Sequence, residues 1–223
     1  MAKIIMHNQV SLDGAISGFQ IDMASYYGIL GSYSAEMFLV GSNTAKSGIY
    51  MFSEEVPEET PEDFLKPKPI QNDKRPFWII PDTEGKLEGL LHVFRQYEHC
   101  KEVIVLVSAK TQNSYINYLN DRNYEYILAG DIKVDFKKAF DELQKIHPFE
   151  TMITDNGGTL SAILLDGNLI DQLSLIISPA LTDKINPKLF RGLKLGERII
   201  ALEPLKAEIM ANKDLLLLFN VMK

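Results

Sequence analysis

The chain has one cysteine, Cys100, among its 223 residues, and it has no long apolar run. A single thiol excludes an internal disulfide and a cysteine metal cluster, and it fits a reducing compartment. No stretch approaches the ~20 apolar residues that a membrane helix needs, and the apolar start of the chain is too short for a signal peptide. We therefore expect a cytoplasmic protein without a membrane partner.

Positive charge is also scarce, because 23 Lys and Arg residues stand against 30 Asp and Glu residues, a formal net charge of −7. This excess of negative charge argues against electrostatic binding to nucleic acid. A local basic pocket that binds a small anion is still compatible with it. His92 and His99 are not spaced as metal ligands on a helix, and no metal is expected. The P-loop and the usual dinucleotide glycine fingerprint are absent as well.

What the sequence does contain is a regular alternation of apolar clusters and helical patterns. Val103–Val107 is β-branched and apolar on every face, as in a central parallel strand. Leu87–Phe94 carries leucines at helical spacing. The order strand, helix, strand predicts a three-layer α/β/α sandwich with a mostly parallel sheet. From residue 169 onward the pattern changes to strands, and Asn212–Asp214 is typical of the turn in a closing antiparallel hairpin.

Residues 50–76 differ from the rest, with five prolines and a cluster of acidic residues. Thr60 followed by Pro61 and Asp63 is the pattern of a capped short helix. Strand patterns lie on both sides of this segment, so we interpret it as a surface insertion or a lid within one domain that spans residues 1–223.

Two glycine-bearing turns follow apolar strands directly. The first begins at Asp155 and continues through Asn156–Thr159, and the second is Gly41–Thr44. A strand that turns through glycine into a helix presents backbone N–H groups at the positive end of the helix dipole, where a phosphate can bind. The plainer alternative is that the glycines serve backbone geometry and that Ser42 caps a helix. Both turns would open on the same side of a parallel sheet, which favours a ligand site.

A third motif, Asn8–Gly14, follows a first strand predicted at Ile4–Met6. Asp13 has an ordinary explanation as the first residue of an Asp-Gly turn. Its functional interpretation is a carboxyl group beside the reacting carbon, where it supplies or relays a proton.

Taken in order, these motifs resemble the dihydrofolate reductase-like superfamily, and within it the reductase domain of riboflavin biosynthesis. The matching segments are Asn8, Ser11–Gly14, Glu36–Thr44, Asp82, Asp155–Leu160, Leu169–Leu173, Ser178–Pro179, Leu189–Gly192 and Leu217–Val221. Two positions depart from the family pattern, because its glutamate appears as Asp155 and its first glycine as Asn156. We expect the asparagine side chain to narrow or reshape the pocket where the cofactor comes close.

The resemblance implies a stand-alone NADPH-dependent reductase that transfers a hydride to a ribosylaminopyrimidine phosphate, and it implies a homodimer. Asp13 would polarise or protonate this small-molecule substrate, Asp155 would be a second contact, and Asn8 and Ser11 would orient the substrate. The implied cofactor residues are Gly41, Ser42, Thr44, Asn156, Gly157, Gly158 and Thr159.

Two alternatives remain at this point. The first is a reductase of the same fold that acts on another pterin-like or carbonyl substrate, which Asn156 and the acidic insertion favour. The second is a nucleotide-binding relative that has lost catalysis.

Overall fold

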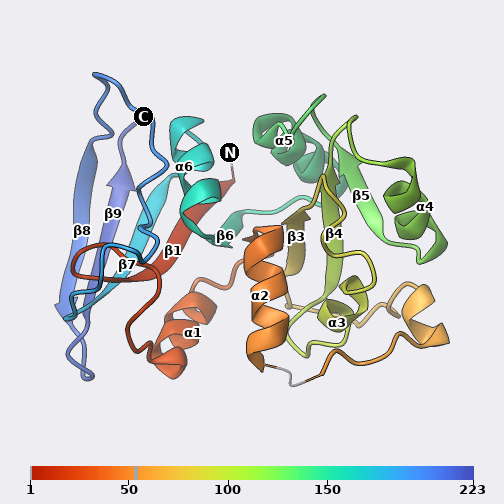
Figure 1. Cartoon of the computed structure of the whole chain (residues 1–223), viewed down its shortest axis with the longest axis horizontal. Coiled ribbons are helices and arrows are strands. Elements are labelled where there is room, and N and C mark those ends of the chain that lie inside the picture. The colour runs from red at the N-terminus through yellow and green to blue at the C-terminus, as the bar shows by residue number, and fades with distance from the viewer. Residues whose placement is uncertain (1, 53–54) are drawn as a thin grey trace. The chain divides into compact units, whose positions relative to one another are not determined.

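The computed structural model describes residues 2–52 and 55–223, and these form two compact units (Figure 1). The terminal unit contains the chain up to Ala35 together with Glu150–Lys223, and the central unit contains Glu36–Phe149. The single domain over residues 1–223 stays a prediction.

The terminal unit is built on strands from both ends of the chain. Its strands are β1 (Lys3–Ser11), β6 (Thr151–Asp155), β7 (Gln172–Ser178), β8 (Leu202–Ile209) and β9 (Leu215–Val221), and its helices are α1 (Met23–Ser32) and α6 (Gly158–Asp166). The strand order is β6-β1-β7-β9-β8. Strand β1 pairs parallel with β6 and β7, whereas β9 pairs antiparallel with β7 and β8. The turn between β8 and β9 contains Lys213 at φ 72°, and this is the expected closing hairpin.

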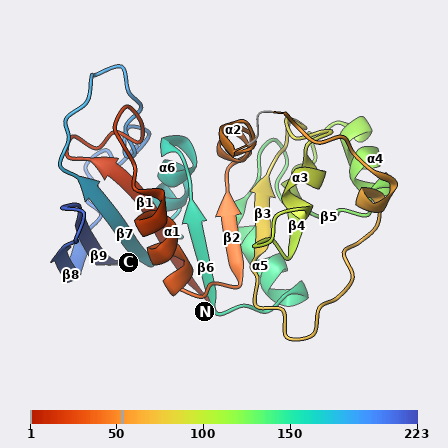
Figure 2. The same ribbon diagram turned by 90° about the horizontal axis from the view of Figure 1, so that it is seen from below.

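The central unit is a parallel sheet with the order β5-β4-β3-β2. Figure 2 shows β2, β3 and β4 running side by side in the same direction. The strands are β2 (Met37–Val40), β3 (Phe77–Pro81), β4 (Glu102–Val107) and β5 (Glu125–Leu128). The helices are α2 (Ser42–Phe52), the 3-10 helix η1 (Pro61–Phe64), α3 (Leu91–Arg95), α4 (Asn113–Asp121) and α5 (Phe136–Ile146).

The inner strands of both sheets are covered on two faces. Val103–Val107 of β4 are each 0% exposed, and β1 is buried from Ile4 to Ser11. Since successive side chains of a strand point to opposite faces, burial of every residue requires cover on both sides. The predicted fold class is therefore confirmed: a mostly parallel α/β/α architecture with antiparallel C-terminal strands.

Strand β1 is longer than the sequence pattern predicts. The predicted strand covers Ile4–Met6, but β1 continues to Ser11 and includes three consecutive polar residues, His7, Asn8 and Gln9. These are 0%, 5% and 5% exposed, and each forms a side-chain hydrogen bond to a residue far away in the sequence. The strand continues because its polar side chains find buried partners, which a local pattern does not contain.

Helix α3 is shorter than predicted. The leucine spacing indicates a helix from Leu87, but α3 begins at Leu91. Gly85 and Gly89 have φ values of 68° and 74°, in the left-handed region that interrupts a helix. Leu87 is buried in a turn instead, where its N–H donates to the Asp82 carboxylate at 2.9 Å.

The described part of the insertion is fixed to the central unit. Thr60 and Asp63 form the predicted capping box of η1. Arg122 donates to the Glu59 carboxylate from Nε at 2.6 Å and from Nη2 at 2.7 Å, and its guanidinium lies 4.4 Å from the centre of the Phe64 ring. These contacts favour a fixed insertion over a lid. Residues 53 and 54 of the segment lie outside the described residues.

Candidate functional site

The turn after β6 leads directly into the N-terminus of α6. Asp155 is the last residue of β6, and Gly157 is the N-cap of α6. Glycine has no side chain to cap the helix, and the first turn of α6 contains no acidic residue. The first N–H groups of a helix lack partners within the helix, and the dipole favours negative charge there. This turn therefore has the local geometry of an anion site.

Asn156 is buried next to the turn, and its effect on the cofactor pocket stays a prediction. Its residue is 1% exposed, and its amide donates a hydrogen bond to the Thr154 hydroxyl. The side chain is directed into the core because it finds a buried acceptor two residues earlier in the chain.

Gly158 allows a close approach between α6 and another segment of the terminal unit. A Cβ atom at this position would lie 2.6 Å from the Lys188 carbonyl oxygen and 3.0 Å from the Leu189 carbonyl oxygen. Even alanine would therefore clash with backbone. For Gly158 the plainer explanation, backbone geometry, is sufficient.

Asp13 is at the centre of a polar cluster at the end of β1. Its carboxylate accepts hydrogen bonds from the Ser11 hydroxyl at 2.6 Å and from the Thr182 hydroxyl at 3.1 Å, and it forms an ion pair with Lys188. Lys188 and then Ser11 hold the pKa of Asp13 far below its usual range. Asp13 therefore stays ionised at neutral pH and has no proton to give.

Asp155 has the opposite electrostatics. Burial raises the pKa of Asp155 from 3.8 to about 6, against a smaller lowering by a hydrogen bond from the Tyr26 side chain. The Tyr26 hydroxyl also lies 3.4 Å from the His7 carbonyl oxygen. A carboxyl group that titrates near neutral pH can exchange a proton with a substrate.

His7 lies in the same core but stays uncharged. Its Nδ1 is 2.8 Å from the Ser174 hydroxyl, and its ring packs 4.7 Å from the Tyr26 ring. Burial lowers the pKa of His7 to about 4, so the imidazole is neutral at physiological pH. Asp155 is therefore the group of this region that changes charge near pH 6.

The second predicted turn lies in the central unit. Gly41 precedes α2, and its carbonyl oxygen accepts a hydrogen bond from the Ala45 N–H at 2.8 Å. Ser42 and Thr44 are half-buried in the first turn of α2, which contains no acidic residue. The strand–glycine–helix arrangement thus occurs twice in the chain, once in each unit.

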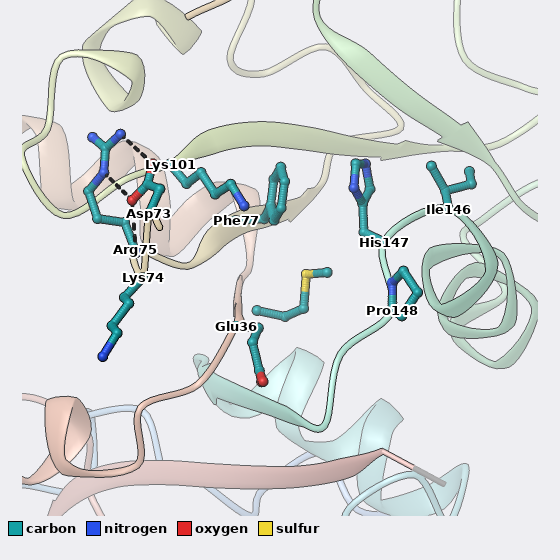
Figure 3. Close-up of a pocket in the computed structure, with 10 residues that line it drawn as sticks. Glu36, Asp73, Lys74, Arg75, Phe77, Lys101, Ile146, His147 and Pro148 are labelled. Carbon is teal, nitrogen blue, oxygen red and sulfur yellow. Dashed lines mark hydrogen bonds and ion pairs between the residues drawn. The ribbon is translucent and has the colours of Figure 1, made fainter. Parts of the chain in front are cut away.

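The central unit also contains a hollow of about 270 Å³, which Figure 3 shows. It lies at the amino ends of β2, β3 and β4, whereas Gly41 follows the carboxyl end of β2. Its lining residues are Glu36, Met37, Asp73, Lys74, Arg75, Phe77, Lys101, Ile146, His147 and Pro148. None of these is a predicted site residue, so the hollow is not part of the predicted site.

The described residues contain neither a metal-binding cluster nor a membrane-spanning helix. No group of three or more His, Cys, Asp or Glu side chains in the described chain could hold a metal ion. Across the same residues, no helix has both the length and the apolar character to span a bilayer.

The family model of the RibD C-terminal domain matches residues 2–213. The chain belongs to the RibD C-terminal domain family. The predicted family resemblance is therefore confirmed, and so is the predicted class, an oxidoreductase of riboflavin biosynthesis. No curated protein matches the chain.

Solved structures with low sequence identity share the fold. A pyrimidine reductase-like protein of Corynebacterium diphtheriae superposes with a TM-score of 0.73 at 16% identity, over 100% of this chain and 92% of that one. RibD of Acinetobacter baumannii gives 0.67 at 15% identity over 100% of this chain, which spans 58% of the RibD chain. Dihydrofolate reductase of Enterococcus faecalis gives 0.50 at 8% identity, over 99% and 97%.

Within the terminal unit, the structure brings several of the predicted residues together. Asn8 contacts Asn156, and Ser11 contacts Asp13. Three residues of the site were not indicated by the sequence. Tyr26 contacts Asp155, Lys188 contacts Asp13, and Ser161 contacts the Asn156 carbonyl oxygen. Lys188 directly precedes the segment that resembles the family's C-terminal pattern, and this was the available signal. Tyr26 and Ser161 carry no local signal, because their importance comes from partners across the fold.

Proposed function

We propose that the protein is an NADPH-dependent reductase that transfers a hydride to a ribosylaminopyrimidine phosphate and yields its ribityl form. The observation that carries this proposal is the uncapped N-terminus of α6 directly beside Asp155, whose pKa is about 6. The turn offers N–H donors to phosphate oxygens, and the carboxyl group offers a proton next to them.

When bound, NADPH supplies the hydride, which goes with its electron pair to the carbon of a C=N or C=O bond while the heteroatom gains a proton. Asn156, Gly157, Gly158 and Thr159 would hold the cofactor's phosphates and ribose on the turn before α6. Gly41, Ser42 and Thr44 keep their predicted role as cofactor residues, because their own helix N-terminus offers the same donors.

We assign the proton to Asp155 and an anchoring role to Asp13. The carboxyl group of Asp155 would hold a proton at neutral pH in part of the molecules and donate it to the heteroatom. Asp13, in its ion pair with Lys188, would fix the surrounding loop and orient the substrate together with Ser11. This assignment reverses the two roles that the sequence predicts.

The test compares the wild-type chain with two matched variants. NADPH absorbance is followed with the ribosylaminopyrimidine phosphate as substrate, for the wild type, for Asp155→Asn, and for Asp166→Asn at the other end of α6 as control. We expect turnover in the wild type and in the control, and a loss of about 10²-fold or more in Asp155→Asn, as for removal of a general acid. Absence of turnover in the wild type would refute the proposal that the ribosylaminopyrimidine phosphate is the substrate.

Asn156 is one of the two features that favour a pterin-like or carbonyl substrate, and its side chain is buried. Oxidation of NADPH by such a substrate, and by no pyrimidine phosphate, would establish that alternative. A wild-type chain that binds no NADPH would instead support the nucleotide-binding relative without catalysis.

The proposal includes a homodimer in the cytoplasm. Strand β8 is the last strand in the order of the terminal unit, and every one of its residues is exposed, including Leu205 at 49% and Ile209 at 75%. An exposed edge strand with apolar residues is a ready surface for pairing with another chain. Sedimentation should give a dimer for the wild type and a monomer for Ile209→Lys, and a monomeric wild type would contradict this part.

A further inference from the structure

Two buried side chains donate to the same backbone oxygen at the glycine turn. Asn8 of β1 is 5% exposed, and its Nδ2 lies 3.0 Å from the Asn156 carbonyl oxygen. Ser161 of α6 is 0% exposed, and its hydroxyl lies 3.3 Å from that oxygen. Because a carbonyl accepts only from donors, the nitrogen of the Asn8 amide must be the atom that faces it.

These donors fix the orientation of the peptide group between Asn156 and Gly157. A trans peptide is planar, and its C=O and N–H bonds point in opposite directions. The described residues contain no cis peptide. With the oxygen held on the side of Asn8 and Ser161, the Gly157 N–H points away from both donors. Gly157 is the N-cap of α6, so this N–H is next to the first N–H groups of the helix.

The oxygen atom of the Asn8 amide accepts no hydrogen bond from the described residues. Its Oδ1 is buried and has no hydrogen-bond partner within the described chain. The Oε1 of the neighbouring Gln9 is likewise buried without a partner there, so the unpaired oxygen does not distinguish Asn8. What distinguishes Asn8 is the partner of its Nδ2, because this donor reaches the backbone of the turn, whereas the Gln9 amide donates to the side chains of Ser178 and Asp214.

We propose that Asn8 is a positioning residue for the phosphate turn: together with Ser161 it holds the Asn156–Gly157 peptide so that the Gly157 N–H faces a bound cofactor phosphate. This inference rests on the proposed function, since it assumes that the turn binds NADPH. It replaces the expected role of Asn8 in orienting the substrate.

Binding and kinetic constants distinguish a role of Asn8 in positioning the turn from a role in orienting the substrate. Asn8→Ala removes the stronger donor, so we expect the Kd for NADPH to rise about tenfold, the effect of one hydrogen bond of ~1.4 kcal/mol. The KM for the pyrimidine substrate and kcat at saturating NADPH should change little. A rise in the substrate KM with an unchanged Kd for NADPH would overturn the proposal and restore the substrate role.

Gln9→Ala is the matched control. Gln9 lies next to Asn8 on the same strand and is equally buried, but its amide donates to Ser178 and Asp214 at 2.8 and 3.1 Å. Equal weakening of NADPH binding in both variants would mean that general damage to β1 is the cause, and would overturn the proposal.

A second variant keeps the test decisive where Asn8→Ala does not fold. Ser161→Ala removes the weaker donor and should raise the Kd for NADPH by a smaller factor, again without a change in the substrate KM. An unchanged Kd in a folded Ser161→Ala chain would then overturn the proposal. A wild-type chain that binds no NADPH would refute the proposed function itself, a result distinct from each of these.

Discussion

Replacing Asp155 by asparagine should make the protein more stable at neutral pH while it removes activity. The substitution preserves shape and exchanges a titratable oxygen for an amide nitrogen. Burial raises the pKa of Asp155 from 3.8 to about 6, so the folded protein carries an ionised carboxylate at pH 7 in an environment that disfavours it. The unfolded chain carries the same charge in water without that cost.

The magnitude follows from the pKa difference. A shift of about two units corresponds to ~3 kcal/mol of unfolding free energy at ~1.36 kcal/mol per unit, which is an upper bound for a half-buried group. The pKa of Asp155 is higher in the folded state than in the unfolded state, so the folded protein keeps this proton up to a higher pH. Wild-type stability should therefore fall as the pH rises from about 4 to about 6 and should be level above that range.

The assay is urea unfolding of the wild type and Asp155→Asn in parallel over this pH range. We expect the two free energies of unfolding to converge near pH 4 and the variant to gain up to ~3 kcal/mol by pH 7. The difference between the chains cancels the titration of groups that both share. A difference that does not change with pH would refute the assignment of a raised pKa to Asp155, and with it the proton-donor argument.

Three further predictions concern the contacts around this centre. Tyr26→Phe removes a hydrogen bond that lowers the pKa of Asp155, so the pH at which kcat/KM falls should move upward, and an unchanged profile would show that the bond has no influence. Lys188→Met should return the pKa of Asp13 toward its usual range, measured by carbon NMR of the carboxyl group; a pKa that stays low would mean that Lys188 is not its main cause. Gly158→Ala should cost ~1–3 kcal/mol of unfolding free energy in urea, because its Cβ would meet a carbonyl oxygen at 2.6 Å, and a neutral substitution would contradict that close approach.

Most strands, and the antiparallel hairpin at the C-terminal end, could be predicted from local patterns. Val103–Val107 is apolar on every face, and the structure buries it on both sides as β4. The closing hairpin was visible in the turn residues Asn212–Asp214. Such features are local, because the residues that specify them are neighbours in the chain.

The pKa shifts and ion pairs of the site could not be predicted from local sequence patterns. Lys188, which lies 175 residues later in the chain, holds the pKa of Asp13 below its usual range, and Asp155 interacts with Tyr26 on a helix that the motifs did not include. The direction of the Asn156 side chain likewise depends on burial. Sequence motifs identified which residue types surround the turns, whereas their charge states depend on distant partners.

The polar stretch His7–Gln9 solves a problem that a strand buried on both faces creates. An apolar strand of this kind would lose little by sliding one residue along its neighbours, since no side chain distinguishes inside from outside. In β1 each polar residue has its own fixed counterpart: Ser174 for His7, the Asn156 carbonyl for Asn8, and Ser178 with Asp214 for Gln9. A slip of one step would break all three attachments at once, so these residues lock the alignment of the strand on which the glycine turn depends.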